Sequence, residues 1–171
     1  MKIPFCTFCV KTRILCSRCQ ALLDSGEYDE NDLEVINAFL NVASSGKLEE
    51  YLKGVEYVKS YSIDNFLVIT LRGIKNLPRT LITQIEKNLE QVLGKKVRIV
   101  EKTGSINEIA MQLASPARIL TIAISWLPDG TNEMIVKITK SEVRKLPFKP
   151  SDFAKMLTLI TGSNTKVEIT R

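Results

Sequence analysis

Four cysteines arranged as two CxxC pairs within fourteen residues constrain this chain more than any other feature. Cys6 and Cys9 form the first pair, and Cys16 and Cys19 form the second. Two thiolates at this spacing can chelate one ion from a single turn, and two such turns supply the four sulfurs of a tetrahedral metal site. Because the sequence contains no histidine, such a site would be built from cysteine alone.

The spacing favours a structural Zn²⁺, because four protein ligands leave no open coordination position for catalysis. An iron–sulfur cluster would use the same ligands, although the bacterial and plant-type ferredoxin spacings are absent. Disulfides and free thiols are the remaining alternatives. Three basic residues, Lys11, Arg13 and Arg18, lie among the cysteines. They either contact phosphates or offset the negative charge of a metal held by four thiolates.

The net charge of +5 is distributed unevenly along the chain. Residues 1–20 carry four basic and no acidic side chains, residues 21–60 three basic and nine acidic, and residues 61–171 seventeen basic and ten acidic. The balances of +4, −6 and +7 suggest that the two ends bind a polyanion. No apolar run approaches the roughly 18 residues of a membrane span, and the first residues lack a signal-peptide core. We therefore expect a cytoplasmic protein without a membrane partner.

Apolar residues at helical spacing predict a helix over residues 33–43, capped by Asn31 or Asp32. The period then changes to two, which is typical of strands. Turn signals at Gly54, at residues 64–65 and at Gly94 separate the elements that follow. These elements are a short helix over 47–53, strands over 55–63 and 66–71, a helix over 78–93 and a strand over 95–100.

The second half of the chain repeats this pattern. Val68-Ile69-Thr70 corresponds to Lys137-Ile138-Thr139 and Leu77-Pro78 to Leu146-Pro147, all at an offset of 69 residues. Each half therefore predicts a compact α+β unit whose sheet is covered on one face. Trp126 is expected to pack at a strand end. The predicted elements are a helix over 106–113, strands over 119–127 and 134–139, a helix over 151–160 and a strand over 166–170.

The four-cysteine segment, the following LCSRCQALLDSG, the acidic start of the first long helix and the later LGKKVRIVE resemble the archaeal KH-domain proteins related to the transcription factor NusA. The resemblance is firmest over residues 1–40 and 93–101. It implies type II KH domains, in the order helix–strand–strand–two helices–strand. The expected fold is α+β, with a zinc knuckle over 1–26 and two KH-like domains over 27–102 and 103–171. Each domain would have a small mixed sheet covered by helices on one face.

One departure from the family pattern concerns the GxxG loop, with which a KH domain clamps the nucleic-acid backbone. Glycine is needed there because the main chain approaches the phosphate and sugar closely. The loop is expected near residues 80–83 in the first half and 148–151 in the second, and neither stretch contains glycine. The clamp residues of the family therefore cannot be transferred to this chain.

The resemblance implies a non-enzymatic protein of transcription or translation that binds RNA or a ribonucleoprotein such as the ribosome or RNA polymerase. An enzyme is disfavoured, because the sequence lacks histidine, a phosphate-cradling glycine loop and paired catalytic carboxylates, and no small-molecule substrate is expected. The alternative is a protein–protein adaptor that uses the knuckle and the acidic helix at 29–43. The candidate RNA-contacting residues are Lys11, Arg13, Arg18, Arg72, Lys75, Arg79, Lys95, Lys96, Arg98, Lys140, Arg144, Lys145 and Lys149.

Overall fold

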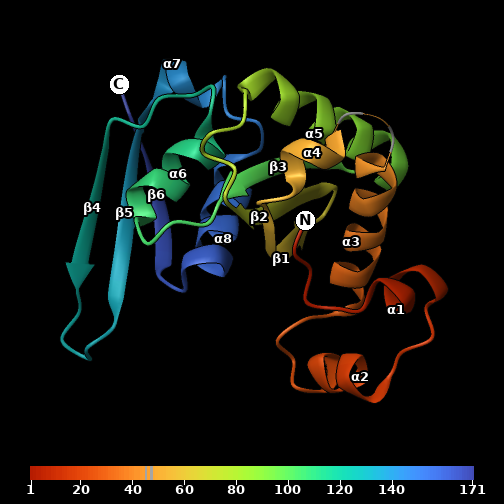
Figure 1. The fold of residues 1–171 in the computed structure, drawn as a ribbon. Helices are drawn as coiled ribbons and strands as arrows, with labels where there is room; N and C mark the ends of the chain where they lie inside the picture. Colours follow the sequence, from red (N-terminus) through yellow and green to blue (C-terminus); the bar gives the residue numbers. More distant parts are fainter. Residues whose placement is uncertain (45, 47) are drawn as a thin grey trace. The chain divides into compact units, whose positions relative to one another are not determined.

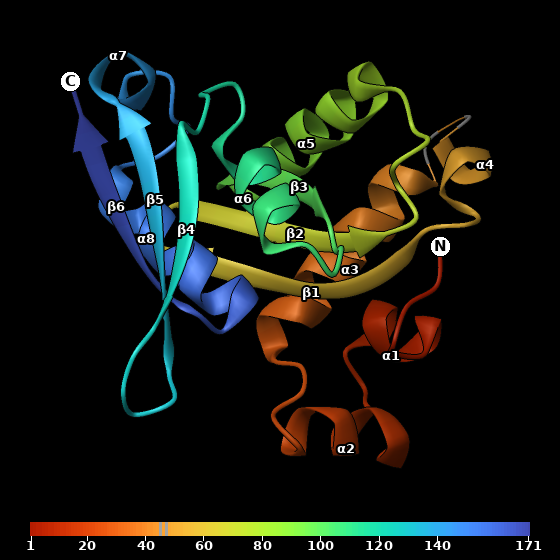
Figure 2. The same ribbon diagram turned by 90° about the vertical axis from the view of Figure 1, so that its left-hand side faces the viewer.

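The computed structural model describes residues 1–44, 46 and 48–171 and divides the chain into two compact units (Figures 1 and 2). The first unit comprises Met1–Ser60 and Asn65–Lys102, and the second comprises Tyr61–Asp64 and Thr103–Arg171. Each unit contains a three-stranded sheet and helices, so the predicted α+β class is confirmed. The cysteine segment, expected as a separate knuckle, belongs to the first unit.

The sheet of the first unit has the strand order β1-β2-β3, in which β2 runs parallel to β3 and Ile69 lies opposite Ile99. β2 is almost entirely buried, as expected for a central strand. The elements in this part of the chain are α1 (Thr7–Thr12), α2 (Ser17–Asp24), α3 (Glu30–Ala43), α4 (Leu48–Leu52), β1 (Glu56–Ile63), β2 (Phe66–Arg72), α5 (Arg79–Leu93) and β3 (Lys96–Glu101).

The cap of α3 differs from the expected Asn31 or Asp32. Asp29 is the N-cap and accepts a hydrogen bond from the Asp32 N–H, while the Asp32 carboxylate accepts one from the Asp29 N–H, both at 3.0 Å. This reciprocal capping box leaves one Asp32 oxygen for the Tyr57 hydroxyl and for the N–H and hydroxyl of Ser60. Asp32 is fully buried and thereby ties α3 to β1.

The knuckle shares the core of the first unit. Phe5, Cys9, Val10 and Cys19 are buried in one cluster with the apolar face of α3. Before the cysteines, Lys2 adds to the edge of the sheet in a parallel bridge opposite Glu56. Its N–H donates to the Val55 carbonyl at 2.7 Å, and its carbonyl accepts from the Tyr57 N–H at 2.9 Å. The start of the chain is thus built into both the core and the sheet.

The second unit repeats the sheet of the first. Its order is β4-β5-β6, with β5 antiparallel to β4 and parallel to β6. Ile138 lies opposite Ile169, which matches the pairing of Ile69 with Ile99 and follows the repeat predicted from the sequence. The elements are α6 (Ile106–Ala114), β4 (Thr121–Trp126), β5 (Asn132–Thr139), α7 (Lys140–Val143), α8 (Pro150–Thr161) and β6 (Asn164–Thr170).

The units differ in the helices that precede their last strand. α7 and α8 both lie between β5 and β6, whereas the described elements place α5 alone between β2 and β3. The expected loop at residues 80–83 lies inside α5, so that placement is wrong; the helical spacing of apolar residues continues through it. The second expected loop, at 148–151, spans the start of α8. None of the described helices is long and apolar enough to cross a membrane.

Candidate metal centre and basic surfaces

Each cysteine pair lies at the beginning of a short helix. Cys6 is the N-cap of α1 and Cys16 is the N-cap of α2, so Cys9 and Cys19 occupy the third helical position. The four Sγ atoms lie within 4.8 Å of one another, and those of Cys6 and Cys16 are 3.9 Å apart. A tetrahedral ion with bonds of about 2.3 Å to sulfur requires sulfur atoms about 3.8 Å apart. The four thiols form a group that could bind a metal ion with little movement.

Hydrogen bonds cross between the two pairs. The Cys6 N–H donates to the Cys19 sulfur and the Cys16 N–H donates to the Cys9 sulfur, both at 3.3 Å. The backbone at the start of each helix therefore bonds to the inner sulfur of the other pair. Such N–H groups, together with the positive ends of the two helices, stabilise thiolate charge. The arrangement fits the charge of a four-thiolate metal site.

The four thiols differ in environment. Cys9 and Cys19 are buried, whereas Cys16 is exposed and Cys6 is intermediate. The Cys19 N–H and the neighbouring thiols lower the pKa of Cys16 to about 6, while burial raises the pKa of Cys19. Because a metal binds thiolates, loading the site would release protons from the inner cysteines.

The outer surface of the knuckle carries both charge and apolar area. Lys11, Arg13 and Arg18 are exposed, as a role in contacting a partner requires. Arg13 ends α1 with a left-handed backbone at φ 61°, a conformation that favours glycine or asparagine over arginine. Phe8 and Ile14 are 65% and 68% exposed on the same segment. Both were missed from the sequence, because they fit the apolar spacing of a small core.

The basic candidates of the first unit fall at opposite ends of its sheet. Arg72, Lys75 and Arg79, which we call the first basic loop, run from the end of β2 to the start of α5 and are exposed. Lys95 precedes β3 and Lys96 is its first residue. Because β3 is parallel to β2 and Lys96 lies opposite Phe66, both lysines lie at the opposite end of the strands from the first basic loop. The structure therefore separates two groups that the sequence could not distinguish.

Two of these side chains are engaged within the protein. Arg72 forms an ion pair with Glu56 at 3.1 Å between exposed groups. Arg98 is half-buried, and burial lowers the pKa of its guanidinium while nearby Glu86 acts in the opposite direction. Arg98 is therefore a weaker candidate for contacting RNA than the exposed residues of the first basic loop.

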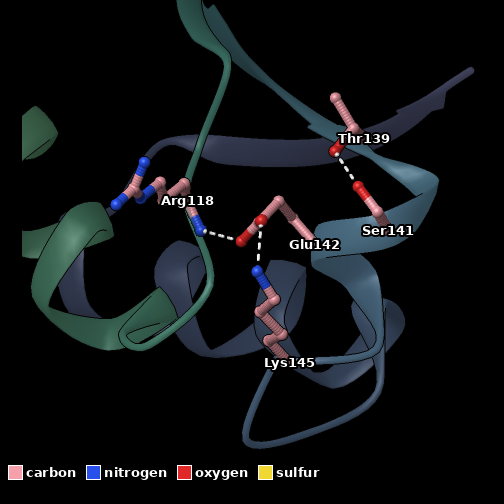
Figure 3. A network of polar contacts seen from close by, with 5 residues as sticks. All are labelled: Arg118, Thr139, Ser141, Glu142 and Lys145. Carbon is pink, nitrogen blue, oxygen red and sulfur yellow. Dashed lines mark hydrogen bonds and ion pairs between the residues drawn. The ribbon is translucent and has the colours of Figure 1, made fainter.

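In the second unit, four exposed basic residues occupy the segment from the end of β5 to the start of α8. We call Lys140, Arg144, Lys145 and Lys149 the second basic loop. Figure 3 shows how this segment is anchored. The Glu142 carboxylate accepts a hydrogen bond from the Lys145 ammonium at 2.6 Å and another from the Arg118 backbone N–H at 2.8 Å. The hydrogen bonds to Lys145 and Arg118 lower the pKa of Glu142.

Comparison with known proteins extends to the fold alone. No family model and no curated protein matches the sequence. Among solved structures, the crystal structure of APE1850 is similar, with a TM-score of 0.56 and 19% sequence identity. The match covers 82% of this chain and 98% of that chain. At this level of sequence identity the match shows a similarity of fold and carries no role over to this chain.

Proposed function

We propose that this protein is a non-enzymatic RNA- or ribonucleoprotein-binding protein, built from two KH-like units and a zinc knuckle. One observation carries the proposal: both units place exposed basic side chains at the same point of the fold. That point is the segment between the end of the central strand and the start of the long helix. Repetition of a charged loop in two equivalent units favours a shared role over chance surface charge.

The chemistry of these two loops suits phosphate. Arg79 is the first residue of α5, and Lys149 is the N-cap of α8. The N-terminus of a helix presents unpaired N–H groups and partial positive charge, so anions are stabilised there. Basic side chains at this position add a full charge to that field. Since neither loop has the GxxG sequence, contacts would come from side chains rather than from a closely approaching backbone.

The experiment measures the affinity of the full chain for single-stranded and structured RNA at two salt concentrations. A triple variant, Lys140→Ala/Arg144→Ala/Lys149→Ala, should bind at least about tenfold more weakly and reduce the salt slope by about 2. The matched control, Lys53→Ala/Lys87→Ala/Lys155→Ala, removes the same charge from exposed sites elsewhere. Equal losses of RNA affinity in the two variants would show that only the net charge of the protein matters. No salt-dependent binding by the wild type would reject direct RNA recognition.

Within this proposal, zinc is the ion that the cysteines hold, because four thiolates in a closed tetrahedron suit it and no redox role is required. Elemental analysis of protein purified without chelator should give one zinc per chain. Bound iron together with absorbance in the visible range would instead indicate an iron–sulfur cluster. Bound zinc would fix the positions of Lys11, Arg13 and Arg18 through the two short helices.

The second candidate, a protein–protein adaptor, is favoured by the exposed Phe8 and Ile14 on the knuckle. Exposed aromatic and aliphatic side chains close to fixed positive charges are typical of protein contact surfaces. Affinity capture from cell extract with and without nuclease separates the two functions. Partners that survive nuclease but are lost in a Phe8→Ser/Ile14→Ser variant would establish the adaptor.

A further inference from the structure

The edge strand β4 of the second unit is exposed in an unusual way. Ile124 and Trp126 are 47% and 72% exposed, and Leu120 beside the strand is 60% exposed. Trp126 ends β4 as expected, but the expectation that it packs there is wrong. The nine residues from 119 to 127 contain no charge and no proline. Edge strands are ordinarily protected by such residues, because an open edge pairs readily with another strand.

The hydrogen bonding of β4 defines which residues face outward. The Leu127 N–H donates to the Thr131 carbonyl at 2.8 Å, continuing the ladder that pairs Ser125 with Glu133. In an antiparallel pair, bonding alternates with residue parity. Within β4, residues of odd number thus bond to β5; just before the strand, the Leu120 N–H also donates to β5, at the Lys137 carbonyl. Ile122, Ile124 and Trp126 direct their N–H and C=O groups to the open edge.

The equivalent edge in the first unit is covered by the chain itself. Lys2 pairs with β1 through hydrogen bonds to Val55 and Tyr57. β1 and β4 are the first strands of their units and hold the same position in the two sheet orders. The same fold therefore receives an added strand residue at one edge and exposes apolar side chains at the other.

We propose that β4 pairs antiparallel with β4 of a second copy of this chain, about a twofold axis at Ile124. This register is self-complementary. Ile124 meets the partner's Ile124, and Ile122 meets the partner's Trp126, so every outward N–H and C=O of the three residues is used. Aliphatic–aromatic pairs directly across strands are stabilising. The β4-β5-β6 sheets of the two copies would then form one continuous sheet of six strands.

Charge at the ends of β4 supports the same register. Arg118 precedes the strand and Asp129 follows it, and both are exposed. Antiparallel pairing about Ile124 brings the end of each strand that carries Arg118 next to the partner's end that carries Asp129, in the turn to β5. Figure 3 shows that Arg118 uses its backbone N–H to bind Glu142, while its guanidinium points away. Opposite charges therefore lie at matching ends of the interface, and no charged residue lies within residues 119–127.

A second copy suits this edge better than RNA does. The strand offers backbone groups and apolar side chains, whereas nucleic acid is bound through positive charge and stacking platforms. A strand from a different protein is the remaining occupant, and it would leave the purified chain monomeric.

The test is the mass of the full chain in solution, measured by sedimentation equilibrium at increasing concentration. Wild type should dimerise, and Ile124→Lys and Ile124→Glu should each weaken dimerisation at least about tenfold, because like charges face each other at the axis. A mixture of the two variants should form a dimer again, since lysine then lies opposite glutamate. Circular dichroism checks that both variants are folded.

Ile169→Lys is the matched control, because Ile169 is 53% exposed on β6 at the other edge of the same sheet. It should dimerise as the wild type does. The proposal is overturned if the wild type stays monomeric at the highest concentration reached, if Ile169→Lys weakens dimerisation as much as Ile124→Lys, or if the folded mixture stays monomeric.

Discussion

The first strands of the two units, β1 and β4, occupy the same place in sheets of the same order, yet their surroundings differ. β1 is exposed at one of its eight positions and receives Lys2 on its edge. β4 is exposed at five of its six positions. The position of a strand in the sheet therefore does not decide whether its outer edge is covered by another segment of the chain. Among the described residues, a chain segment pairs with the open side of β1, and none pairs with that of β4.

The interiors of the units differ as well. The described buried carboxylates, Asp32, Glu86 and Glu101, all lie in the first unit. Each accepts backbone N–H bonds: Asp32 from Asp29 and Ser60, Glu86 from Ile99, and Glu101 from Gly73 and Ile74. The buried polar residues of the second unit are Ser163 and Thr165. The first unit is therefore held together by polar anchors in addition to apolar packing.

If the four cysteines bind a metal ion as proposed, removing the ion or one inner ligand should affect the first unit most. Cys9→Ala takes away a buried ligand whose sulfur accepts the Cys16 N–H. We expect a loss of about 3 kcal/mol or more in unfolding free energy, because metal binding is coupled to folding. Hydrogen exchange should show the loss in residues 1–60 and leave β5 protected. Ser17→Ala is the control, and equal loss in both units would contradict the asymmetry.

Asp32→Ala should be the next most damaging change. It leaves the buried Tyr57 hydroxyl and Ser60 N–H without their acceptor, which costs about 3 kcal/mol. Urea denaturation measures this difference. The exposed Glu34 on the same helix is the control, because Glu34→Ala should change the free energy of unfolding by less than about 0.5 kcal/mol. Similar losses in the two variants would mean that Asp32 is not an anchor.

Lys2→Pro would make the edge of β1 more like that of β4. Proline removes the N–H donated to Val55, at a cost of about 1 kcal/mol. The amide of Tyr57 should then exchange faster with solvent, because the strand residue bonded to it is loosened. Lys2→Ala keeps both backbone bonds and should leave that exchange rate unchanged. Faster exchange in both variants would point to the side chain of Lys2 instead.

The smallest effect is expected in the second unit, at Glu142. Lys145 and the Arg118 N–H lower the pKa of this carboxylate. Since its pKa is lower in the folded state than in the unfolded chain, its stabilisation is present above the unfolded pKa and is lost as the pH falls through the folded pKa. Glu142→Gln should therefore reduce the melting temperature slightly at neutral pH and not in acid. A difference that persists in acid would require another cause.

Most elements of this fold could be predicted from the sequence. Strand period, helix spacing and turn signals placed all six strands, and the offset of 69 residues anticipated the matching pairs Ile69–Ile99 and Ile138–Ile169. These patterns are local or repeated, so they can be detected without tertiary contacts. The cysteine spacing likewise predicted the clustered thiols.

Other features depend on contacts that leave no periodic signal. The bridge of Lys2 to β1 involves one residue, and the anchoring role of Asp32 arises from partners 25 and 28 residues away. The exposure of Trp126 depends on what lies beside β4, which an apolar strand pattern cannot reveal. The clustering of basic residues at the strand ends was implicit in the repeat, since Lys75 and Arg144 are 69 residues apart.

The segment that carries the cysteines is held at both of its ends, by Lys2 on β1 and by Asp29 at the start of α3. Closing a loop of this length has an entropic cost that grows only slowly with its size. In the folded first unit both ends of the segment are fixed, so a metal ion bound by the cysteines would not have to close this loop by itself. The intact chain should therefore bind a metal ion more tightly, and release it more slowly, than a free peptide with the same four cysteines.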